Sequence, residues 1–386
     1  MSENAVMTEG TGPAVLASVC DFGWGSLGKL RLILEQLGNT PVALDEEAAS
    51  TPLVRSMLTD RFRFARCARG DAVVALVIND PVAANKITAC GTPVIYVDSL
   101  PYLWTTPEEV PEDAAVYCAQ RYPGGAAPAE GPLSGRAIYW VDPIVPQGRR
   151  RRGGRGAVLN VGGLHSHLSG EAPDAYVRLV MLPLAAALRR GGHCVWAVCG
   201  NLPPWACEAI AEILPGCERI GRQSPSAFEE TISAADLLFT SPGSTTLLQA
   251  AAANLPTVLL PPQNLSQMLN AEIYSSARTV RIGWPQSVID SARLADLRPL
   301  GEDAGLEYVY AALVAAGRSP AARDAVAASI SAAVSVPSSG SYLADELSDL
   351  GYSGASQVAR VIRQAVLAPL PRPGRHVRPA DDVHGT

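Results

Sequence analysis

Short, continuously apolar runs alternate with segments of helical periodicity along most of this chain, and this alternation is the strongest constraint on its fold. Strands buried on both faces of a parallel sheet read as continuous apolar runs, and helices connect them. The first series comprises VLASVC (15–20), AVVALVI (72–78), TPVIYVD (92–98), AAVYC (114–118) and AIYWV (137–141). After the first run, Leu27, Leu30, Leu34 and Leu37 recur at the spacing of one helix face. The pattern predicts an α/β fold with a mostly parallel sheet.

The alternation stops at PQGRRRRGGRG (146–156), where glycine and arginine replace apolar residues, which is typical of a domain linker. It then starts again with VLNVGG (158–163), CVWAVCG (194–200), LLFT (237–240) and TVLL (257–260). We therefore expect two Rossmann-like domains, residues 13–148 and 156–367, which face a cleft that holds the ligand. Helices after about residue 322 are expected to close the second domain, and residues 368–386 to form a disordered tail.

Composition argues against several classes of function. The net charge of -6 disfavours a nucleic-acid partner, because no positive field attracts a polyanion. The eight cysteines include no C-x-x-C pair, so we expect reduced thiols and no metal site. The N-terminal MSENAVMTEG lacks the basic segment of a signal peptide, and no apolar run approaches the length of a membrane span. We expect a cytoplasmic protein without a membrane partner.

The stretch SPGSTTLLQAAAANLP (241–256) follows a predicted strand and turns at once into a short helix. The first N–H groups of such a helix are unpaired, and the helix dipole favours an anion beside them. Ser244, Thr245 and Thr246 add hydroxyl donors at the same end, so the stretch is suited to a phosphate. The alanines let the helix lie close to the sheet, and Asn254 is suited to a left-handed turn before Pro256. Simple helix capping by the hydroxyls is the alternative interpretation.

Two more segments are predicted to reach the same edge of the second sheet. Gly162 and Gly163 end a strand in VLNVGGLHSHLSG (158–170), where the backbone can approach a diphosphate. PPQNLSQMLNAE (261–272) follows the next predicted strand and carries the amides Gln263, Asn264, Gln267 and Asn270. Amides suit a neutral ligand with many hydroxyls, such as a sugar.

Together these residues resemble a known family. The pattern S-P-G-x-x-T-x-x-[EQ]-A-x-x-x-x-x-P-x-x-L-x-P, followed by Q-x-x-N-A, is similar to the donor domain of inverting GT-B glycosyltransferases. The group includes the N-acetylglucosaminyltransferase of peptidoglycan lipid synthesis, and the resemblance is strong from about residue 158 to 271. It implies the GT-B fold, with two Rossmann-like domains around a cleft, and metal-independent transfer from a UDP-sugar without a cofactor. No Asp-x-Asp sequence is present.

The same resemblance assigns roles to donor-side residues. It implies that Gly162, Gly163, Gly243, Ser244 and Thr245 hold the diphosphate, with Thr246 beside them. Gln249 takes the place of a glutamate that commonly grips the ribose, so a charge-assisted bond is lost there. Gln267 maps near the donor sugar, Asn270 supports its loop, and IGRQSPSAF (220–228) falls where the nucleotide base usually binds.

The first domain resembles a narrower group. FGWGSLGKL (22–30), NDP (79–81) and VDSLPYLW (97–104) are similar to the cytosylglucuronate synthases of nucleoside-antibiotic biosynthesis, which join glucuronate from UDP-glucuronate to N1 of cytosine. In the wider family the first turn is often Gly-x-Gly-His, whereas this chain has Gly23, Trp24, Gly25 and Ser26. Because the first domain has no histidine, the candidate general bases are Asp21, Asp80 and Asp98, each at a predicted strand end.

A cytosine acceptor and a glucuronate donor suggest further contacts. The aromatic side chains of Trp24, Tyr102 and Trp104 offer flat faces for a base, although filling of the core is an equal alternative. The carboxylate of glucuronate needs a cation, for which the candidates are Lys29, Arg31 and Arg222. His165 and His167 flank the glycine turn of the second domain and are candidates for contact with the phosphate or the leaving group.

Rival functions remain open at this point. The chain is expected to be a glycosyltransferase, with another small acceptor as one alternative. A nucleotide-sugar 2-epimerase shares the fold, but the scarcity of histidine, five in 386 residues, counts against it. A binding protein without turnover is favoured by Gln249 and by the missing N-terminal histidine. The sequence leaves the acceptor, the base and the oligomeric state open, a homodimer included.

Overall fold

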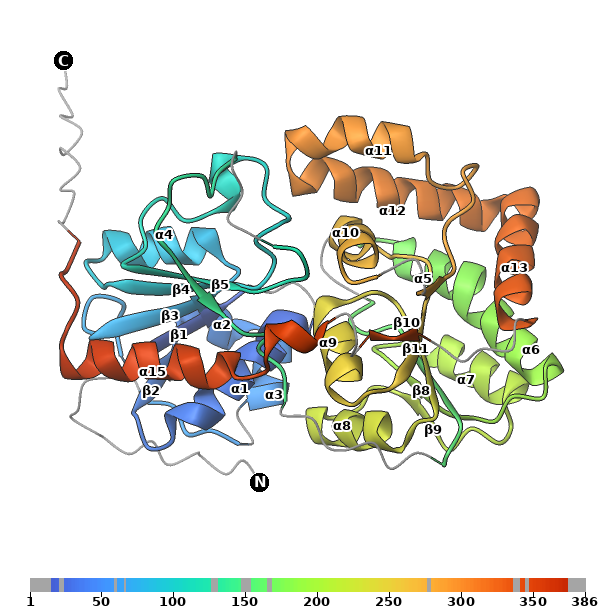
Figure 1. Ribbon diagram of the computed structural model, residues 1–386, viewed down its shortest axis with the longest axis horizontal. Helices are drawn as coiled ribbons and strands as arrows, with labels where there is room; N and C mark the ends of the chain where they lie inside the picture. The colour runs from blue at the N-terminus through green and yellow to red at the C-terminus, as the bar shows by residue number, and fades with distance from the viewer. Residues whose placement is uncertain are drawn as a thin grey trace, which may run out of the picture.

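A computed structural model describes residues 15–20, 24–58, 61–65, 67–125, 131–146, 154–164, 169–275, 279–335, 341–343 and 347–373 of the chain. Two parallel sheets lie side by side, and helices cover the faces of both (Figure 1). The two-sheet α/β architecture predicted from the sequence is thereby confirmed. Among the described residues, no helix combines the length and the apolar character needed to cross a bilayer.

The N-terminal sheet has the strand order β2-β1-β3-β4-β5-β6, and all its neighbouring strands are parallel. Strands β1, β3 and β4 are buried along their whole length, which explains their unbroken apolar sequences. The strands are β1 (Val15–Val19), β2 (Val42–Leu44), β3 (Val74–Ile78), β4 (Val94–Asp98), β5 (Val116–Gln120) and β6 (Ile138–Val141). The connecting helices are α1 (Gly25–Leu37), α2 (Glu46–Ser50), α3 (Pro52–Leu58) and α4 (Pro81–Ala89), with a 3-10 turn at Pro107–Glu109.

The C-terminal sheet has the order β12-β11-β10-β7-β8-β9, which is the 3-2-1-4-5-6 order of a doubly wound nucleotide-binding sheet. Its parallel strands are β7 (Ala157–Asn160), β8 (Val195–Cys199), β9 (Arg219–Gly221), β10 (Leu237–Thr240), β11 (Pro256–Leu259) and β12 (Val280–Arg281). The short strand β13 (Ser341–Tyr342) pairs antiparallel with β11.

Helices of the C-terminal half cover this second sheet. They are α5 (Ala172–Tyr176), which continues through a π-helical turn at Val177–Met181, α6 (Leu182–Arg190), α7 (Pro204–Ile213), α8 (Pro225–Ala234), α9 (Ser244–Ala252), α10 (Leu265–Ile273), α11 (Ser291–Leu297), α12 (Glu302–Arg318) and α13 (Pro320–Ser335). In α9, Ala250 and Ala251 are buried against neighbouring side chains, and Asn254 takes the left-handed conformation with φ 50°. Both features agree with the predictions from the alanine-rich stretch.

Both sheets leave a crevice at the point where their winding reverses. In the N-terminal sheet β1 lies between β2 and β3, and in the C-terminal sheet β7 lies between β8 and β10. Loops that leave the carboxyl ends of the strands on either side of such a point diverge, which creates room for a ligand. Helix α1 follows β1, and helix α9 follows β10, so both begin at these two crevices.

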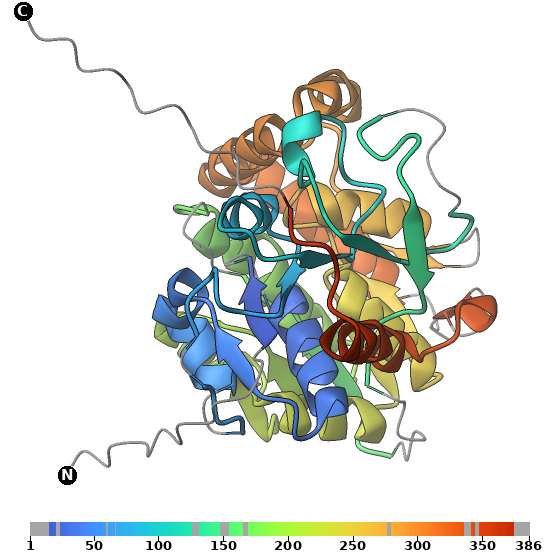
Figure 2. The same cartoon turned by 90° about the vertical axis from the view of Figure 1, so that its left-hand side faces the viewer.

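The last helix, α15 (Gly354–Leu367), corrects one expectation. We expected it within the C-terminal domain, but it packs against α1 and the N-terminal sheet, as Figures 1 and 2 both show. Its apolar stripe of Val358, Ile362 and Ala365 joins the core around β1 and β3. The helical periodicity reveals this stripe but does not specify the sheet that covers it. Of the tail predicted at residues 368–386, residues 368–373 form no helix or strand, and residues 374–386 lie outside those described.

The chain therefore crosses between the halves twice, and the two crossings are bonded together at Asp142. The Asp142 backbone N–H donates to Gln357 Oε1 at 2.7 Å, and Ser353 Oγ donates to Asp142 Oδ2 at 2.5 Å. Gly354 lies so close to the Asp142 carbonyl that an added Cβ would stand 2.0 Å from its oxygen.

Candidate functional site

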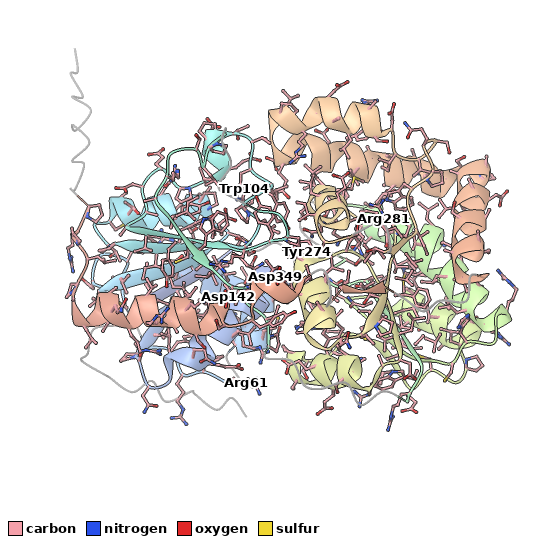
Figure 3. The ribbon with its side chains drawn as sticks, viewed as in Figure 1. Arg61, Trp104, Asp142, Tyr274, Arg281 and Asp349 are labelled. Atoms are coloured by element: carbon pink, nitrogen blue, oxygen red, sulfur yellow. The ribbon has the colours of Figure 1, made fainter. Side chains whose placement is uncertain are left out.

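A cavity of about 810 Å³ lies between the two sheets and is lined by both of them. The N-terminal wall is built from the ends of β1, β3 and β4 and from α1, and the C-terminal wall from α5, α9, α10 and α12. The predicted donor-side residues all line it, namely Gly162, Gly163, Arg222, Gly243, Ser244, Thr245, Thr246, Gln249, Gln263, Gln267 and Asn270. From the predicted acceptor side, Trp24, Gly25, Ser26, Lys29 and Trp104 line it. In Figure 3, Trp104 lies on the N-terminal side of the boundary between the halves.

The start of α9 has the form that the sequence predicted. Gly243 is its N-cap residue and makes no side-chain cap, so the first N–H groups of the helix are available at the cavity. Across from this turn, the backbone at Gly162 has a φ of 58°, a conformation that favours glycine. Asn160 joins the two turns, because its Oδ1 accepts from Gly162 N at 3.1 Å and its Nδ2 donates to Thr240 Oγ1 at 3.0 Å.

The amides after β11 build the loop as much as they offer contacts to a ligand. Gln263 Nε2 donates to Val161 O at 2.9 Å, and Gln267 Oε1 accepts from Gln263 N at 2.9 Å. Asn264 caps α10, and Asn270 Nδ2 donates to Pro242 O at 2.8 Å. These bonds fix the shape of the C-terminal wall before any ligand arrives, which the sequence alone did not reveal. The loop-supporting position predicted for Asn270 agrees with its bond to Pro242.

Lys29 reaches from α1 to the C-terminal wall of the cavity. Its side chain is only 1% exposed, and Nζ donates to Thr245 Oγ1 at 2.7 Å, across the boundary between the halves. Burial lowers the pKa of Lys29 to about 8, an effect that the nearby Cys20 thiol partly opposes. The structure thus brings Lys29 to the turn at Gly243–Thr245, at the start of α9.

The N-terminal wall of the cavity includes a small polar network at the ends of β3 and β4. Asn79, with φ 52°, donates through Nδ2 to Ser26 Oγ at 2.9 Å and to Ser99 Oγ at 2.8 Å. Its Oδ1 accepts from Ser99 N at 2.9 Å. Asn79 was not among the predicted site residues, although it begins the NDP motif.

The structure does not bring Asp80 or Asp98 into the cavity. Asp80 caps α4 by accepting from Ala83 N at 2.9 Å. Asp98 is fully buried and accepts from Trp104 Nε1 at 2.9 Å and from Tyr117 OH at 2.7 Å. Burial raises the pKa of Asp98 to about 6, and these bonds partly oppose the rise. Asp98 therefore positions Trp104 and does not itself face the cavity. The other predicted base, Asp21, lies outside the described residues, as do Gly23, His165 and His167.

Two other predicted contacts are engaged within the protein. Tyr102 does not line the cavity, because its hydroxyl donates to Asn270 Oδ1 across the domain boundary. Arg31 lines the cavity, but its guanidinium forms ion pairs with Glu35 and Glu229, each at 2.8 Å. The charge of Arg31 is thus already balanced. Among the predicted cations, this leaves Arg222 and Lys29 for an anionic ligand.

Arg222 and Trp24 form a mixed pair on the cavity wall. The Arg222 guanidinium lies 5.2 Å from the centre of the Trp24 ring, and its Nη2 donates to Ser56 Oγ at 2.5 Å. The pair connects the start of α1 and the helix α3 of the N-terminal half to the segment after β9, and all three residues line the cavity. A guanidinium over an indole is a stacked arrangement that a planar ligand can extend.

Glu302, the first residue of α12, was missed by the sequence reasoning. Among the described residues that line the cavity, it is the one carboxylate. Burial, with smaller effects from Glu109 and Asp303, raises the pKa of Glu302 to about 7. Its backbone N–H donates to Glu109 Oε1 at 2.6 Å, so it stands against the loop of the N-terminal half that carries Trp104. Glu302 does not follow directly on a strand, whereas the sequence analysis looked for acidic residues at the ends of predicted strands.

The fold and the cavity together define the structural class of the protein. Two doubly wound sheets that face one cavity, with a glycine turn and a helix start on the C-terminal side, are the architecture of GT-B proteins. The model of the CGA synthase-related protein family matches residues 51–299, and the chain belongs to this family. A comparison with curated proteins gave no match.

Several solved structures are similar to this chain. MurG of Acinetobacter baumannii superposes with a TM-score of 0.51 at 12% identity, covering 91% of this chain and 99% of MurG. UGT2 of Phytolacca americana, complexed with UDP-2-fluoro-glucose and pterostilbene, gives a TM-score of 0.49 at 12% identity, over 92% and 99% of the two chains. The spinosyn rhamnosyltransferase SpnG, complexed with thymidine diphosphate, gives 0.48 at 13% identity, over 91% and 100%. Of these three, the MurG superposition exceeds a TM-score of 0.5, and at 12% identity it supports the GT-B fold alone.

None of the described residues form a group of three or more histidine, cysteine or acidic side chains that would hold a metal ion.

Proposed function

We propose that this protein is a glycosyltransferase that moves a sugar from a nucleoside diphosphate to a small acceptor with inversion at the anomeric carbon. The observation that carries the proposal is the convergence of the uncapped α9 start and the Gly162 turn on one cavity. Both present backbone N–H groups to the same space, and such groups stabilise the negative charge of a departing diphosphate. The chain belongs to the CGA synthase-related family and has the GT-B fold, and both facts are consistent with this chemistry.

In the proposed reaction the bond between the anomeric carbon and the β-phosphate oxygen breaks, and a bond from the acceptor nitrogen or oxygen to that carbon forms on the opposite face. The electron pair of the broken bond stays on the diphosphate. The proton of the acceptor goes to a base, and we assign this role to Glu302, whose raised pKa of about 7 suits proton transfer near neutral pH. Its contact with the loop that carries Trp104 supports a role toward the acceptor.

The specific reaction we propose is transfer of glucuronate from UDP-glucuronate to N1 of cytosine. The supporting features are the motifs at 22–30, 79–81 and 97–104, which resemble cytosylglucuronate synthases. Trp104 and Trp24 line the cavity and offer flat faces to a pyrimidine. Arg222 lines the same cavity and forms no ion pair within the described part of the chain, so its guanidinium is suited to a sugar carboxylate.

The test is release of UDP from a panel of UDP-sugars, with and without cytosine, combined with mass spectrometry of the product. UDP release that requires cytosine, together with a product of cytosine plus glucuronate, is the expected result. Release with another acceptor keeps the transferase but changes the substrate. An altered sugar without acceptor identifies an epimerase, and tight binding without turnover identifies a binding protein. We expect turnover to persist in EDTA.

Calorimetric titration tests the identity of the donor sugar without an acceptor. We expect UDP-glucuronate to bind more tightly than UDP-glucose, since its carboxylate gains a charge-assisted bond to Arg222. The variant Arg222→Gln should remove this preference and leave UDP-glucose binding within about threefold, because a charge-assisted bond is worth more than a neutral one. Equal binding of both sugars by the unmodified protein would contradict the glucuronate assignment.

A further inference from the structure

Two helices meet end to end in the cavity, and neither end is capped by a side chain. The N-cap residues are Trp24 for α1 and Gly243 for α9, and neither helix has an acidic residue in its first turn. A Cβ added to Gly25 would stand 3.2 Å from Thr245 Oγ1, so the two first turns are in contact. Each helix start carries a partial positive charge, and here the two charges lie together.

Lys29 adds a full positive charge at this junction. Its ammonium group has three protons, and one of them bonds to Thr245 Oγ1. The ion pairs within the described part of the chain do not include Lys29. With 1% exposure, this side chain is shielded from the water that would otherwise stabilise its charge. Burial of a cation without a counter-charge is costly, and a bound anion removes that cost.

We propose that Lys29 is the counter-ion of the donor diphosphate and that it is supplied by the N-terminal domain, so the donor is held by both halves of the molecule. This inference rests on the proposed function, since it names the residue that neutralises the leaving group. It differs from the role of Lys29 that the sequence suggested, which was contact with the acceptor or with glucuronate. The bond to Thr245 places the ammonium at the start of α9, while the polar network of Asn79 and Ser99 lies at the ends of β3 and β4.

The charges around Lys29 support this assignment. From β1 the Cys20 thiol faces it, and on its own helix Arg31 is balanced by Glu35 and by Glu229 of α8. Helix α9 contributes no charged residue, as its sequence STTLLQAAA shows. Within α1 and α9, Lys29 is therefore the charged side chain that forms no ion pair in the described part of the molecule, and a dianionic diphosphate at the junction would pair with it.

Proton uptake follows from this environment. In the free protein the pKa of Lys29 is lowered to about 8, and a diphosphate beside the ammonium would raise it again. At pH 8 the binding of a nucleoside diphosphate should therefore draw a proton from the buffer. Above pH 8 the affinity should fall as the free lysine loses its charge.

The sequence offers a matched control, because Lys29 and Lys86 are the only two lysines in the chain. Lys86 lies on α4, is 47% exposed and pairs with Glu47. We propose calorimetric titration of the unmodified protein and of Lys29→Met, Lys29→Arg and Lys86→Met with UDP, uridine and inorganic pyrophosphate. Repeating the UDP titration at pH 8 in buffers of different ionisation enthalpy measures the proton uptake.

Lys29→Met is expected to weaken UDP and pyrophosphate binding about tenfold to a hundredfold, the range for loss of a bond to a charged group. Uridine binding should stay within about twofold, because uridine has no phosphate. Lys86→Met should match the unmodified protein, and Lys29→Arg should recover part of the loss. UDP binding by Lys29→Met within about twofold of the unmodified protein would overturn the inference.

Nuclear magnetic resonance gives a second readout that needs no variant. Protein labelled with 13C at lysine Cε should show two lysine signals, since the chain has two lysines. The Lys29 signal is expected to titrate near pH 8 in the free protein and at a clearly higher pH with UDP, with the Lys86 signal as reference. A Lys29 midpoint that UDP does not move would overturn the inference even if Lys29→Met fails to fold.

Different results would contradict the proposed function and the role of Lys29. If the unmodified protein binds neither UDP nor thymidine diphosphate, the proposed function and this inference both fall. If it binds UDP and Lys29→Met binds it equally well, the proposed function stands and the role of Lys29 is wrong.

Discussion

The two walls of the cavity are built on different principles. The C-terminal wall around α9 and α10 is neutral, and its amides are tied to backbone groups, as in the bonds of Asn160 and Asn270. The N-terminal wall carries the buried charge of Lys29, which reaches across to Thr245. In the opposite direction, Glu302 of the C-terminal half stands against the N-terminal loop that carries Trp104. Lys29 of the N-terminal half thus contacts the C-terminal wall, and Glu302 of the C-terminal half contacts the N-terminal wall. Neither half alone therefore forms a complete site.

The largest effect is expected from removal of the charge that the C-terminal half contributes. Glu302→Gln keeps the shape of the side chain but cannot accept a proton, so kcat should fall by about 10² to 10⁴. Because we assign Glu302 to the acceptor and not to the diphosphate, the affinity for UDP should stay within about twofold. The measurement is steady-state turnover of the unmodified protein and the variant, together with calorimetric titration of UDP.

The pH profile sharpens this test. A base with a pKa of about 7 gives a rate that rises with pH and levels off above it. Glu109 and Asp303 are the acidic groups that act on the pKa of Glu302, so Glu307→Gln, at an exposed position on the same helix, is the matched control. A rate for Glu302→Gln equal to that of Glu307→Gln would remove Glu302 from the mechanism.

The neutral wall is tested by removal of its hydroxyls. The double variant Thr245→Val and Thr246→Val loses two donors at the start of α9 and also the partner of Lys29. We expect UDP affinity to fall about tenfold to a hundredfold, as the loss of two hydrogen bonds to an anion implies. Thr40→Val, which removes a hydroxyl bonded to Leu37 O far from the cavity, is the control. Unchanged affinity in the double variant would exclude the phosphate assignment of this turn.

The buried charge of Lys29 is expected to lower the free energy of unfolding of the protein. Folding lowers the pKa of Lys29 from 10.5 to about 8, so the folded protein binds fewer protons than the unfolded chain between these values. The buried charge therefore destabilises the fold fully below pH 8, and the effect fades as the pH rises toward 10.5. The lowered pKa corresponds to about 3 kcal/mol, so Lys29→Met should raise the free energy of unfolding by about 1–3 kcal/mol at pH 7 after loss of the Thr245 bond.

Chemical denaturation at pH 7 and at pH 10 checks this prediction. The gain of Lys29→Met should shrink between the two pH values, whereas Lys86→Met, at an exposed ion pair, should change stability by less than about 1 kcal/mol at either. A destabilised Lys29→Met at pH 7 would show that the ammonium already has a counter-charge in the free protein.

The smallest effect on stability and UDP binding is expected from Tyr102, whose hydrogen bond between the two walls involves no charged group. Tyr102 donates its hydroxyl to Asn270, which in turn holds the Pro242 carbonyl of the α9 turn. Tyr102→Phe should cost about 1 kcal/mol of stability and weaken UDP binding less than about threefold, because only one neutral bond between the halves is lost. Thermal unfolding and calorimetry measure both quantities. A loss of UDP affinity as large as that of Lys29→Met would place the control of the donor site in this contact instead.

Local signals explain what the sequence predicted well. Continuous apolar runs identified the buried strands β1, β3, β4 and β8, because burial on both faces leaves no polar alternation. The Ser-Pro-Gly turn before α9 was found because turn residues, hydroxyls and a helix start follow one another within a few positions. Such features depend on neighbouring residues only.

The remaining features depend on contacts between distant residues. Lys29 and Thr245 are 216 positions apart, and no periodicity connects them. Asp98 has the same place at a strand end as a catalytic aspartate would, but Trp104 and Tyr117 bind its carboxylate away from the cavity. Glu302 begins a helix that follows no strand, and α15 carries an apolar stripe that fits either sheet. Pattern rules place side chains along an element and do not specify the partner across the molecule.

The bonds at Asp142 have a consequence for how the chain can be divided. Gln357 and Ser353 bond to Asp142, so the start of α15 is bound to the end of the N-terminal sheet. An isolated N-terminal half would expose the apolar groove that α15 fills, so a stable fragment would require residues 354–367 to be grafted back.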